Sequence, residues 1–228
     1  MLLGARAEAA LNDAFRSAAT VGHLLRLWDV GANIGWYSWT FLSSMAQRHA
    51  LLLEPDPDNL ALLHRTVRRL VTRATILPLA ASDHSGSARF ATDPLTAATG
   101  SLVTHDTFLA RHYGREGDSL EVATTRLDDL LGCFGAPDFI KIDVEGAEHL
   151  VFAGASALLR AQPVIIYETT SANRDRLTAL LTGLGYRLFD AEGYGQHEQV
   201  SPNVLAWPTR LHHRTEELLK EWRSRQPP

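Results

Sequence analysis

Acidic residues stand at the ends of four short apolar runs, where carboxylates could hold a polar ligand. They are Glu54, Asp83, the pair Asp143 and Glu145, and Glu168. A carboxylate that leaves a buried strand is costly to desolvate unless a cation, hydrogen-bond donors or water meet it. Capping of a following helix explains one or two such acids, but it explains the pair Asp143 and Glu145 poorly. The pattern therefore favours a ligand-binding site at these strand ends.

A glycine-containing turn follows the first apolar run. Gly31, Asn33 and Gly35 form a Gly-x-Asn-x-Gly pattern, in which glycines let the backbone turn tightly and approach a ligand. The helix that follows would present free N–H groups to an anion. Glu54 comes 19 residues after Gly35, an offset at which an acid can accept hydrogen bonds from the two hydroxyls of a ribose. The alternatives are an ordinary tight turn for the glycine pattern and a solvated acid for Glu54.

Ser82 and Asp83 follow the third apolar run. A carboxylate at Asp83 could accept a hydrogen bond from the exocyclic amine of an adenine, although Asp beside Ser and Gly is also a common turn former. The glycine turn, the acid for the ribose, the acid for the adenine and the later acids come in the order needed to hold a nucleoside with an amino-acid tail.

The elements that must position these residues alternate between strand and helix, which predicts an α/β fold with a doubly wound, mostly parallel sheet. In such a sheet a ligand binds beyond the carboxyl ends of the strands, so the acids are expected to meet at one edge. The expected strands are Leu24–Val30, Ala50–Leu53, Ile76–Ala81, Asp138–Ile142 and Val164–Tyr167, with further short strands at Ala88–Ala91 and Leu120–Thr124. The expected helices are Ile34–Ala46, Asn59–Leu70, Arg126–Leu131, Ala147–Leu159 and Asn173–Leu184.

The chain of 228 residues is expected to form a single domain (1–228) with a helix at each end as an appendage, over about 5–19 and 209–225. Before the last helix, Tyr186–Asp190 and Val204–Trp207 are expected to pair as an antiparallel hairpin. The amphipathic last helix could pack on the domain or offer a surface for a homodimer. The long segment Thr92–Ser119 is the expected acceptor-binding loop, since loops of this length commonly cover a site.

Composition excludes several classes of function. The net charge is −4 and no basic tract interleaved with aromatic residues occurs, which argues against nucleic acid as a partner. No run approaches the roughly 18 apolar residues of a membrane span, and the N-terminus lacks the pattern of a signal peptide, so a cytoplasmic location is expected. Cys133 is the single cysteine, so neither a disulfide framework nor a cysteine-based zinc site can form.

Several motifs together resemble the FkbM-type family of class I S-adenosylmethionine-dependent methyltransferases. The resemblance covers roughly Trp28 to Trp207, and its most specific parts are the Ile-Asp-Val-Glu-Gly-Ala-Glu block and the Thr-x-Leu-Asp segment. Gly100-Ser101-Leu102 also looks like a landmark of the family. The residues that carry the resemblance are 29–35, Glu54-Pro55, 81–83, 125–130, 139–148 and Tyr167-Glu168.

The resemblance implies a seven-stranded sheet with an antiparallel last strand, and O-methylation of a hydroxyl on a natural product, a sugar or a glycan. S-adenosyl-L-methionine would be the donor and S-adenosyl-L-homocysteine the product. Glu54 would hold the ribose, and Asp143 would lie closest to the methyl group. The remaining cofactor-binding residues would be Gly31, Asn33 and Gly35 at the methionine end, Ser82 and Asp83 at the adenine, and Asp29, which orients the glycine turn or meets the ammonium group through water.

A carboxylate base would assist removal of the acceptor's proton, typically by about 10²–10⁴-fold. Asp143 and Glu145 are the first candidates, with Glu168 third. The same three carboxylates could instead hold a divalent cation such as Mg²⁺, but no diagnostic metal-binding loop is present, and a metal is not favoured.

Two other functions share parts of this pattern. A nicotinamide-dependent oxidoreductase would have the fold, the turn and Glu54, but it should show Gly-x-Gly-x-x-Gly, and Asn33 occupies the second glycine position. A binding module that has lost catalysis would also keep the fold. The acids at four strand ends argue against this second alternative.

Overall fold

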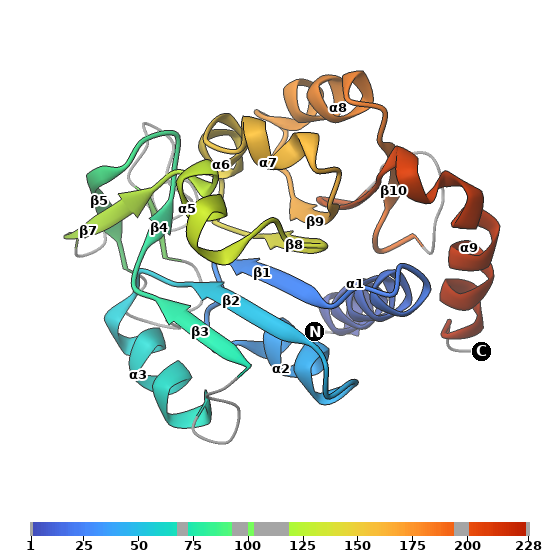
Figure 1. Ribbon diagram of the computed structural model, residues 1–228, viewed down its shortest axis with the longest axis horizontal. Helices are drawn as coiled ribbons and strands as arrows, with labels where there is room; N and C mark the ends of the chain where they lie inside the picture. The colour runs from blue at the N-terminus through green and yellow to red at the C-terminus, as the bar shows by residue number, and fades with distance from the viewer. Residues whose placement is uncertain (1, 68–72, 93–99, 103–118, 194–200, 227–228) are drawn as a thin grey trace.

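The computed structural model describes residues 2–67, 73–92, 100–102, 119–193 and 201–226 (Figure 1). Seven strands form the central sheet: β1 (Arg26–Val30), β2 (His49–Leu53), β3 (Ala74–Leu77), β8 (Phe139–Ile142), β9 (Val164–Glu168), β10 (Arg187–Asp190) and β11 (Asn203–Trp207). Their order is β10-β11-β9-β8-β1-β2-β3, and all pair in parallel except β11, which is antiparallel to both neighbours. The predicted α/β class, the seven strands and the terminal hairpin are confirmed.

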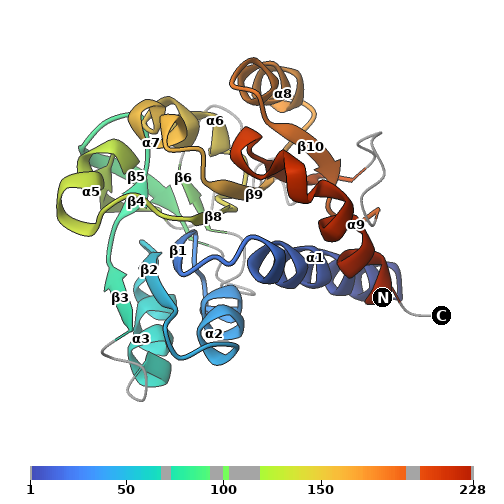
Figure 2. The ribbon, with the colours of Figure 1, turned by 45° about the vertical axis from the view of Figure 1, so that its right-hand side comes forward.

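Helices cover both faces of this sheet, as Figures 1 and 2 show. On one face lie α1 (Leu2–Val21), α2 (Trp36–Ser43) and α3 (Pro57–Thr66), and on the other lie α5 (Leu127–Phe134), α6 (Glu148–Ala153), α7 (Ser156–Arg160) and α8 (Arg174–Gly183). The 3₁₀ helix η2 (Thr209–Arg214) leads into α9 (Thr215–Ser224), which packs against α1. No helix in the described part of the chain is both long and apolar enough to cross a bilayer.

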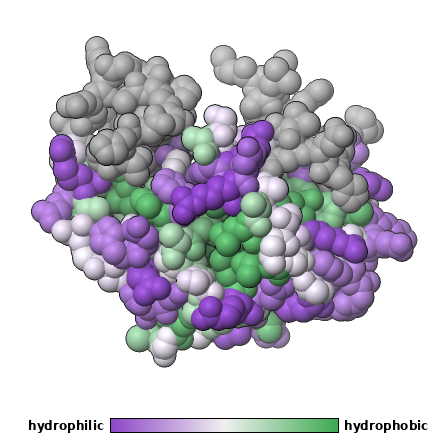
Figure 3. All heavy atoms as spheres, turned by 90° about the horizontal axis from the view of Figure 1, so that it is seen from above, coloured by the Kyte–Doolittle hydropathy of each residue, from purple (hydrophilic) through white to green (hydrophobic). Residues whose placement is uncertain are grey.

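Alternation along the strands divides the core in two, because successive side chains point to opposite faces. Leu27 belongs to the core under α1 and α2, and Trp28 belongs to the core under α5–α8. Figure 3 shows the outer side of the second layer, where apolar side chains gather in the middle. A groove between α6–α7 and α8 is lined by residues that include Phe152, Leu177 and Leu180.

The short strands expected at 88–91 and 120–124 are present, but they belong to a second, smaller sheet that was not predicted. It consists of β4 (Ala80–Ala81), β5 (Gly86–Ala91), β6 (Ser101–Leu102) and β7 (Ser119–Thr125), in the order β4-β7-β5-β6. The expected strand Ile76–Ala81 is therefore divided between two sheets. Pro78 lies at the division, and it cannot donate a ladder hydrogen bond; the N–H of Leu79 turns back to the carbonyl of Leu77 at 2.9 Å.

The expected helix Ala147–Leu159 is also two helices, α6 and α7. The carboxylate of Asp128 accepts hydrogen bonds from the N–H groups of Ala157 and Leu158 and so caps a new helix. At the break, a Cβ on Gly154 would lie 2.1 Å from the carbonyl oxygen of Ser82. This close approach requires glycine and brings α6 against the segment that follows β4.

The apolar stripe of the C-terminal helix faces the protein's own core. Leu218 and Trp222 are fully buried in the cluster that contains Phe15 of α1, so these two side chains are not available to a partner. The predicted loop Thr92–Ser119 lies largely outside the described residues, which include only Thr92, 100–102 and Ser119 of it.

Candidate functional site

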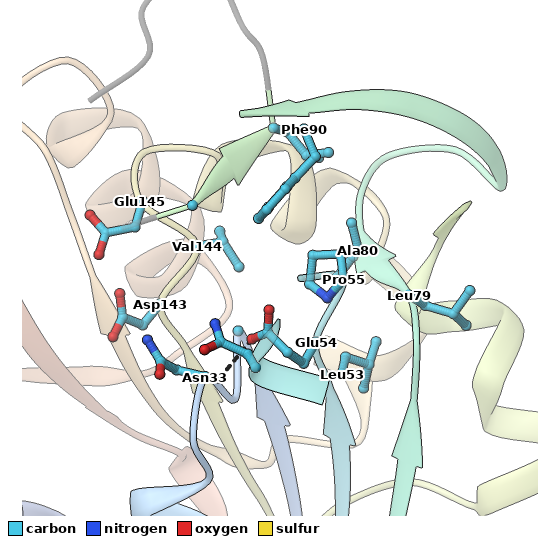
Figure 4. A pocket seen from close by; sticks show the side chains of 15 residues that line it. Asn33, Leu53, Glu54, Pro55, Leu79, Ala80, Phe90, Asp143, Val144 and Glu145 are labelled. Carbon is cyan, nitrogen blue, oxygen red and sulfur yellow. Dashed lines mark hydrogen bonds between the residues drawn. The ribbon is translucent and has the colours of Figure 1, made fainter. Parts of the chain in front are cut away.

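The carboxyl ends of β1, β2 and β8 meet at one edge of the central sheet because these strands run in parallel. A pocket of about 580 Å³, open mouth included, lies at this edge (Figure 4). Polar side chains line one side and apolar side chains the other. The lining residues are Gly31, Asn33, Leu53, Glu54, Pro55, Asn59, Leu79, Ala80, Ala81, Phe90, Gly100, Leu102, Asp143, Val144 and Glu145.

The turn after β1 is packed tightly against the end of β8. Gly31 has a φ of +71°, and a Cβ there would lie 1.9 Å from the carbonyl oxygen of Asp143. Asn33 also adopts a left-handed conformation, with φ of +50°, which asparagine tolerates better than most residues. Glycine at 31 thus allows the two strand ends to touch, and this contact brings Asp143 to the pocket.

The backbone N–H groups of this turn all donate hydrogen bonds within the protein. The N–H groups of Gly31 and Ala32 donate to Leu53, those of Asn33 and Ile34 donate to side chains, and that of Gly35 donates to Ala32. Each N–H from 31 to 35 therefore has an acceptor within the protein. The turn shapes the pocket without supplying the donors that a pyrophosphate needs.

Glu54 is buried at the end of β2, with its carboxylate in the pocket. One oxygen accepts the N–H of Asn33 at 2.7 Å and the other accepts the N–H of Asp56 at 2.9 Å. Burial raises the pKa of Glu54, while the two backbone donors oppose this shift. Each oxygen has capacity for a second hydrogen bond, so the carboxylate is held rigidly and can still receive hydroxyl donors from a ligand.

Lys141 connects the first strand to the acids of β8. Its ammonium nitrogen lies 2.8 Å from the carbonyl oxygen of Gly31, 3.2 Å from Oδ2 of Asp143 and 3.9 Å from Oδ1 of Asp29. Burial alone would lower the pKa of Lys141, but the carboxylates of Asp143 and Asp29 outweigh burial and raise it. Asp29 is itself buried and accepts two hydrogen bonds from Ser38, so it supports the turn from beneath and does not line the pocket.

Three carboxylates cluster at the ends of β8 and β9. Asp143, Glu145 and Glu168 each offer an oxygen within 4.8 Å of the others. Burial, followed by the charges of Asp143 and Glu145, raises the pKa of Glu168 to about 9. Glu145 has a left-handed φ of +54°, a conformation that side-chain-bearing residues rarely adopt. A proton on Glu168 relieves the repulsion among these groups, and a cation held by the three carboxylates would do the same.

The structure does not bring every predicted residue into this pocket. Ser82 is buried and donates to Asp83, and Asp83 lies at the surface, where His84 approaches it to 2.7 Å and lowers its pKa. Gly35, with φ of +83°, packs against the indole of Trp39. An adenine role for Ser82 and Asp83 and a methionine role for Gly35 remain predictions, and the lining residues nearest to Ser82 in the chain are Ala80 and Ala81.

The apolar wall of the pocket was missed by the sequence analysis. Phe90 and Leu102 come from the small sheet, and a Cβ on Gly100 would lie 2.6 Å from the ring of Phe90. Gly100 and Leu102 belong to the segment 100–102 that looked like a landmark of the family. The structure places both residues in the lining of the pocket. The place of Phe90 in the pocket wall depends on the pairing of β5 with β6 and β7, which the local sequence does not indicate.

The sequence model of the methyltransferase FkbM domain matches residues 29–188. A curated relative, hexuronic acid methyltransferase AglP from Haloferax volcanii, is 34% identical over 146 residues, which cover 62% of this chain and 54% of that protein. The chain thus spans about half the length of this relative.

Solved structures with similar folds include a putative caffeoyl-CoA O-methyltransferase from Staphylococcus aureus, with a TM-score of 0.50 at 13% identity, covering 86% of this chain and 80% of that one. A precorrin-6y C5,15-methyltransferase from Geobacter metallireducens gives a TM-score of 0.48 at 16% identity, covering 85% and 87%. The first of these likenesses shows the Rossmann-like methyltransferase fold.

Proposed function

Because this chain belongs to the FkbM methyltransferase family, we propose that it transfers a methyl group from S-adenosylmethionine to a hydroxyl of a sugar, a glycan or another natural product. S-adenosylmethionine is a substrate in this reaction, and it supplies a methyl group on a positively charged sulfur.

The charge of the pocket is the observation that carries this proposal. Glu54, Asp143 and Glu145 are its charged lining residues, and no Lys, Arg or His occurs among the described residues that line it. A sulfonium, an ammonium and ribose hydroxyls suit such a surface, whereas a pyrophosphate would be repelled. The turn from 31 to 35 adds to this preference, because its N–H groups are already bound.

The two sides of the pocket fit the two ends of the donor. Glu54 offers acceptor capacity for the ribose hydroxyls, and the wall that contains Leu79, Phe90 and Leu102 would bury the base. Asp143 and Asn33 lie on the polar side (Figure 4), toward which the methionine part and its methyl group would point.

Deprotonation of the acceptor would fall to Asp143 or Glu145. A carboxyl with a pKa of about 9, as for Glu168, carries its proton at neutral pH and cannot accept another. As the acceptor oxygen bonds to the methyl carbon, the carbon–sulfur bond breaks and its electron pair stays on sulfur. The hydroxyl proton passes to the carboxylate. Holding oxygen, carbon and sulfur in line can account for about 7–11 kcal/mol of the barrier.

A sugar hydroxyl is the acceptor class that this site favours. The named relative acts on a hexuronic acid, and such a sugar has both hydroxyl and carboxylate oxygens. The carboxylates of Asp143 and Glu145 would repel an anionic acceptor oxygen, but either can receive a hydroxyl proton. We therefore propose that an ether, and not an ester, is formed.

Calorimetry with S-adenosylhomocysteine and, separately, NAD tests the donor. Binding of the first without the second supports the proposal, and the reverse result, or no binding of either, contradicts it. Tritium-labelled S-adenosylmethionine with glucuronic acid, glucose and their methyl glycosides then tests the acceptor. A label that survives mild alkali indicates an ether, whereas label released as methanol indicates a methyl ester and would refute the proposed hydroxyl chemistry.

A further inference from the structure

Glu148 is a fully buried acid that the reaction described above does not use. It is the first residue of α6, and its relative exposure is 0%. Oε1 accepts the N–H groups of Val144 at 3.2 Å and Gly146 at 3.1 Å. These two bonds hold the segment that carries Asp143 and Glu145, including the left-handed residue between the two donors.

The other oxygen of Glu148 reaches the segment that follows β9. Oε2 accepts the side-chain amide of Asn173, which is itself buried, at 3.1 Å. Oδ1 of Asn173 accepts the hydroxyl of Thr169 at 2.7 Å and the N–H of Thr170 at 2.8 Å. Asn173 therefore fixes the two residues directly after Glu168.

Backbone pairing between these two segments ends before the carboxylates. The parallel register of β8 and β9 stops at Ile142 opposite Tyr167, one residue before Asp143 and Glu168. Beyond that point the Glu148–Asn173 hydrogen bond joins the two segments. The carboxyl groups of Asp143, Glu145 and Glu168 lie within 4.8 Å of one another beyond the paired strands, so this bond fixes the spacing between the two segments.

We propose that Glu148 and Asn173 are positioning residues that set the distance between Asp143 and Glu145 on one strand end and Glu168 on the next. This inference rests on the proposed function, since it assigns to the pair the geometry of the methyl-transfer site. A merely structural role would require only that the buried polar groups are satisfied; a positioning role also requires that catalysis follow the distance between the strand ends.

The proposal can be tested by exchanging the amide donor and the carboxylate acceptor of this pair, which leaves the net charge of the double variant unchanged. Asn173→Asp places two carboxylates opposite each other, and Glu148→Gln places two amide donors opposite each other. In the double variant Glu148→Gln/Asn173→Asp, the new amide donates to the new carboxylate. Its oxygen still accepts from Val144 and Gly146, so every hydrogen bond described above is restored with the direction of one reversed.

Each single variant is expected to lower kcat by about 100-fold, the effect of a displacement near 1 Å, with little change in KM for the donor. The double variant should recover most of the lost kcat. Gln162→Glu is the matched control, because Gln162 also makes two hydrogen bonds but lies before the start of β9, at the opposite edge of the sheet. It should leave kcat unchanged even if it lowers the melting temperature.

Crystal structures of the same variants test the geometry without any assay. The oxygens of Glu168 should lie beyond 4.8 Å from those of Asp143 and Glu145 in Asn173→Asp and return within that distance in the double variant. A single variant that keeps both the spacing and kcat, or a folded double variant that recovers neither, overturns the inference. If the wild-type protein binds no donor, the proposed function fails, and the spacing still decides whether the pair sets the distance.

Discussion

The ammonium nitrogen of Lys141 lies 3.2 Å from Oδ2 of Asp143, on the boundary between the core and the pocket. The lysine side chain is 7% exposed and the aspartate side chain 38% exposed. The same ammonium also reaches Gly31 and Asp29. One buried cation thus links the glycine turn, the acid beneath it and the acid nearest to the proposed reaction.

Replacement of this cation should destabilise the protein. In Lys141→Met the charge of Asp29, whose side chain is 1% exposed, loses its cationic partner, and we expect unfolding in urea to show a loss of about 3–5 kcal/mol. Lys220→Met, at an exposed position of α9, is the control and should be near neutral. Adding Asp29→Asn to Lys141→Met should recover part of the loss; a double variant less stable than Lys141→Met would contradict the pairing.

Glu54 should determine the affinity for the donor. Glu54→Gln puts an amide N–H₂ opposite the N–H of Asn33 or of Asp56 and removes an acceptor for the ribose. Hydrogen bonds to charged groups contribute about 1.5–3 kcal/mol, so the Kd for S-adenosylhomocysteine should rise about 10- to 100-fold. Calorimetry measures this change. Asp58→Asn, an exposed acid in the first turn of α3, should leave the Kd unaltered, and an unaltered Kd in Glu54→Gln would exclude the ribose role.

Gly100 should be intolerant of a side chain because of Phe90. A Cβ at position 100 would lie 2.6 Å from the ring, so Gly100→Ala must displace Phe90 in the pocket wall. Overpacking of this kind costs about 1–3 kcal/mol, and donor affinity should fall by about tenfold or more. Gly132→Ala introduces the same methyl group where nothing lies within 4 Å. Equal donor affinities of these two variants would show that the wall does not contact the donor.

Asp143→Asn should reduce turnover far more than stability. The fold keeps its core, while loss of a catalytic base lowers kcat by about 10²–10⁴-fold. Glu145→Gln, measured beside it, identifies which carboxylate is the base, since only one of the two should show the full loss. An unchanged kcat in Asp143→Asn would remove this residue from catalysis.

Removal of metal ions should leave the activity intact. The repulsion among Asp143, Glu145 and Glu168 is already relieved by a proton, since the pKa of Glu168 is raised to about 9 by burial first and then by its neighbours. We expect the turnover of protein dialysed against EDTA to equal that of untreated protein. Activity that disappears on dialysis and returns with Mg²⁺ would show instead that the three carboxylates hold a cation.

The polar side of this pocket could be predicted because the ends of apolar strands can be recognised from the sequence alone. A parallel strand ends at the same edge as its neighbours, so Glu54 and Asp143 could be placed together from apolar runs alone, and both line one pocket. Most helices and strands of the large sheet could also be predicted from local patterns of apolar residues. Their breaks at Pro78 and Gly154 did not, because those depend on contacts between distant segments.

The parts that the sequence did not indicate depend on long-range side-chain contacts. Asn173 holds Glu148 across 25 residues, and Phe90 reaches the pocket only through a sheet that was not anticipated. Asp83 resembles an adenine ligand by position, but in the structure it lies beside His84 at the surface. The position of a residue just after a strand predicts at which edge of the sheet it lies. It does not predict the direction in which its side chain points.

The small sheet that carries Phe90 and Leu102 shares no strand with the large sheet in the part of the chain described here. The strand pairing of the large sheet therefore positions the segments that carry the acids. The separate pairing of the small sheet positions Phe90 and Leu102 in the apolar wall opposite them. Protein engineers can accordingly treat the two as modules: replacement of the apolar side chains of β5 and β6 by those of a relative would reshape the apolar wall while the register of the large sheet stays as it is.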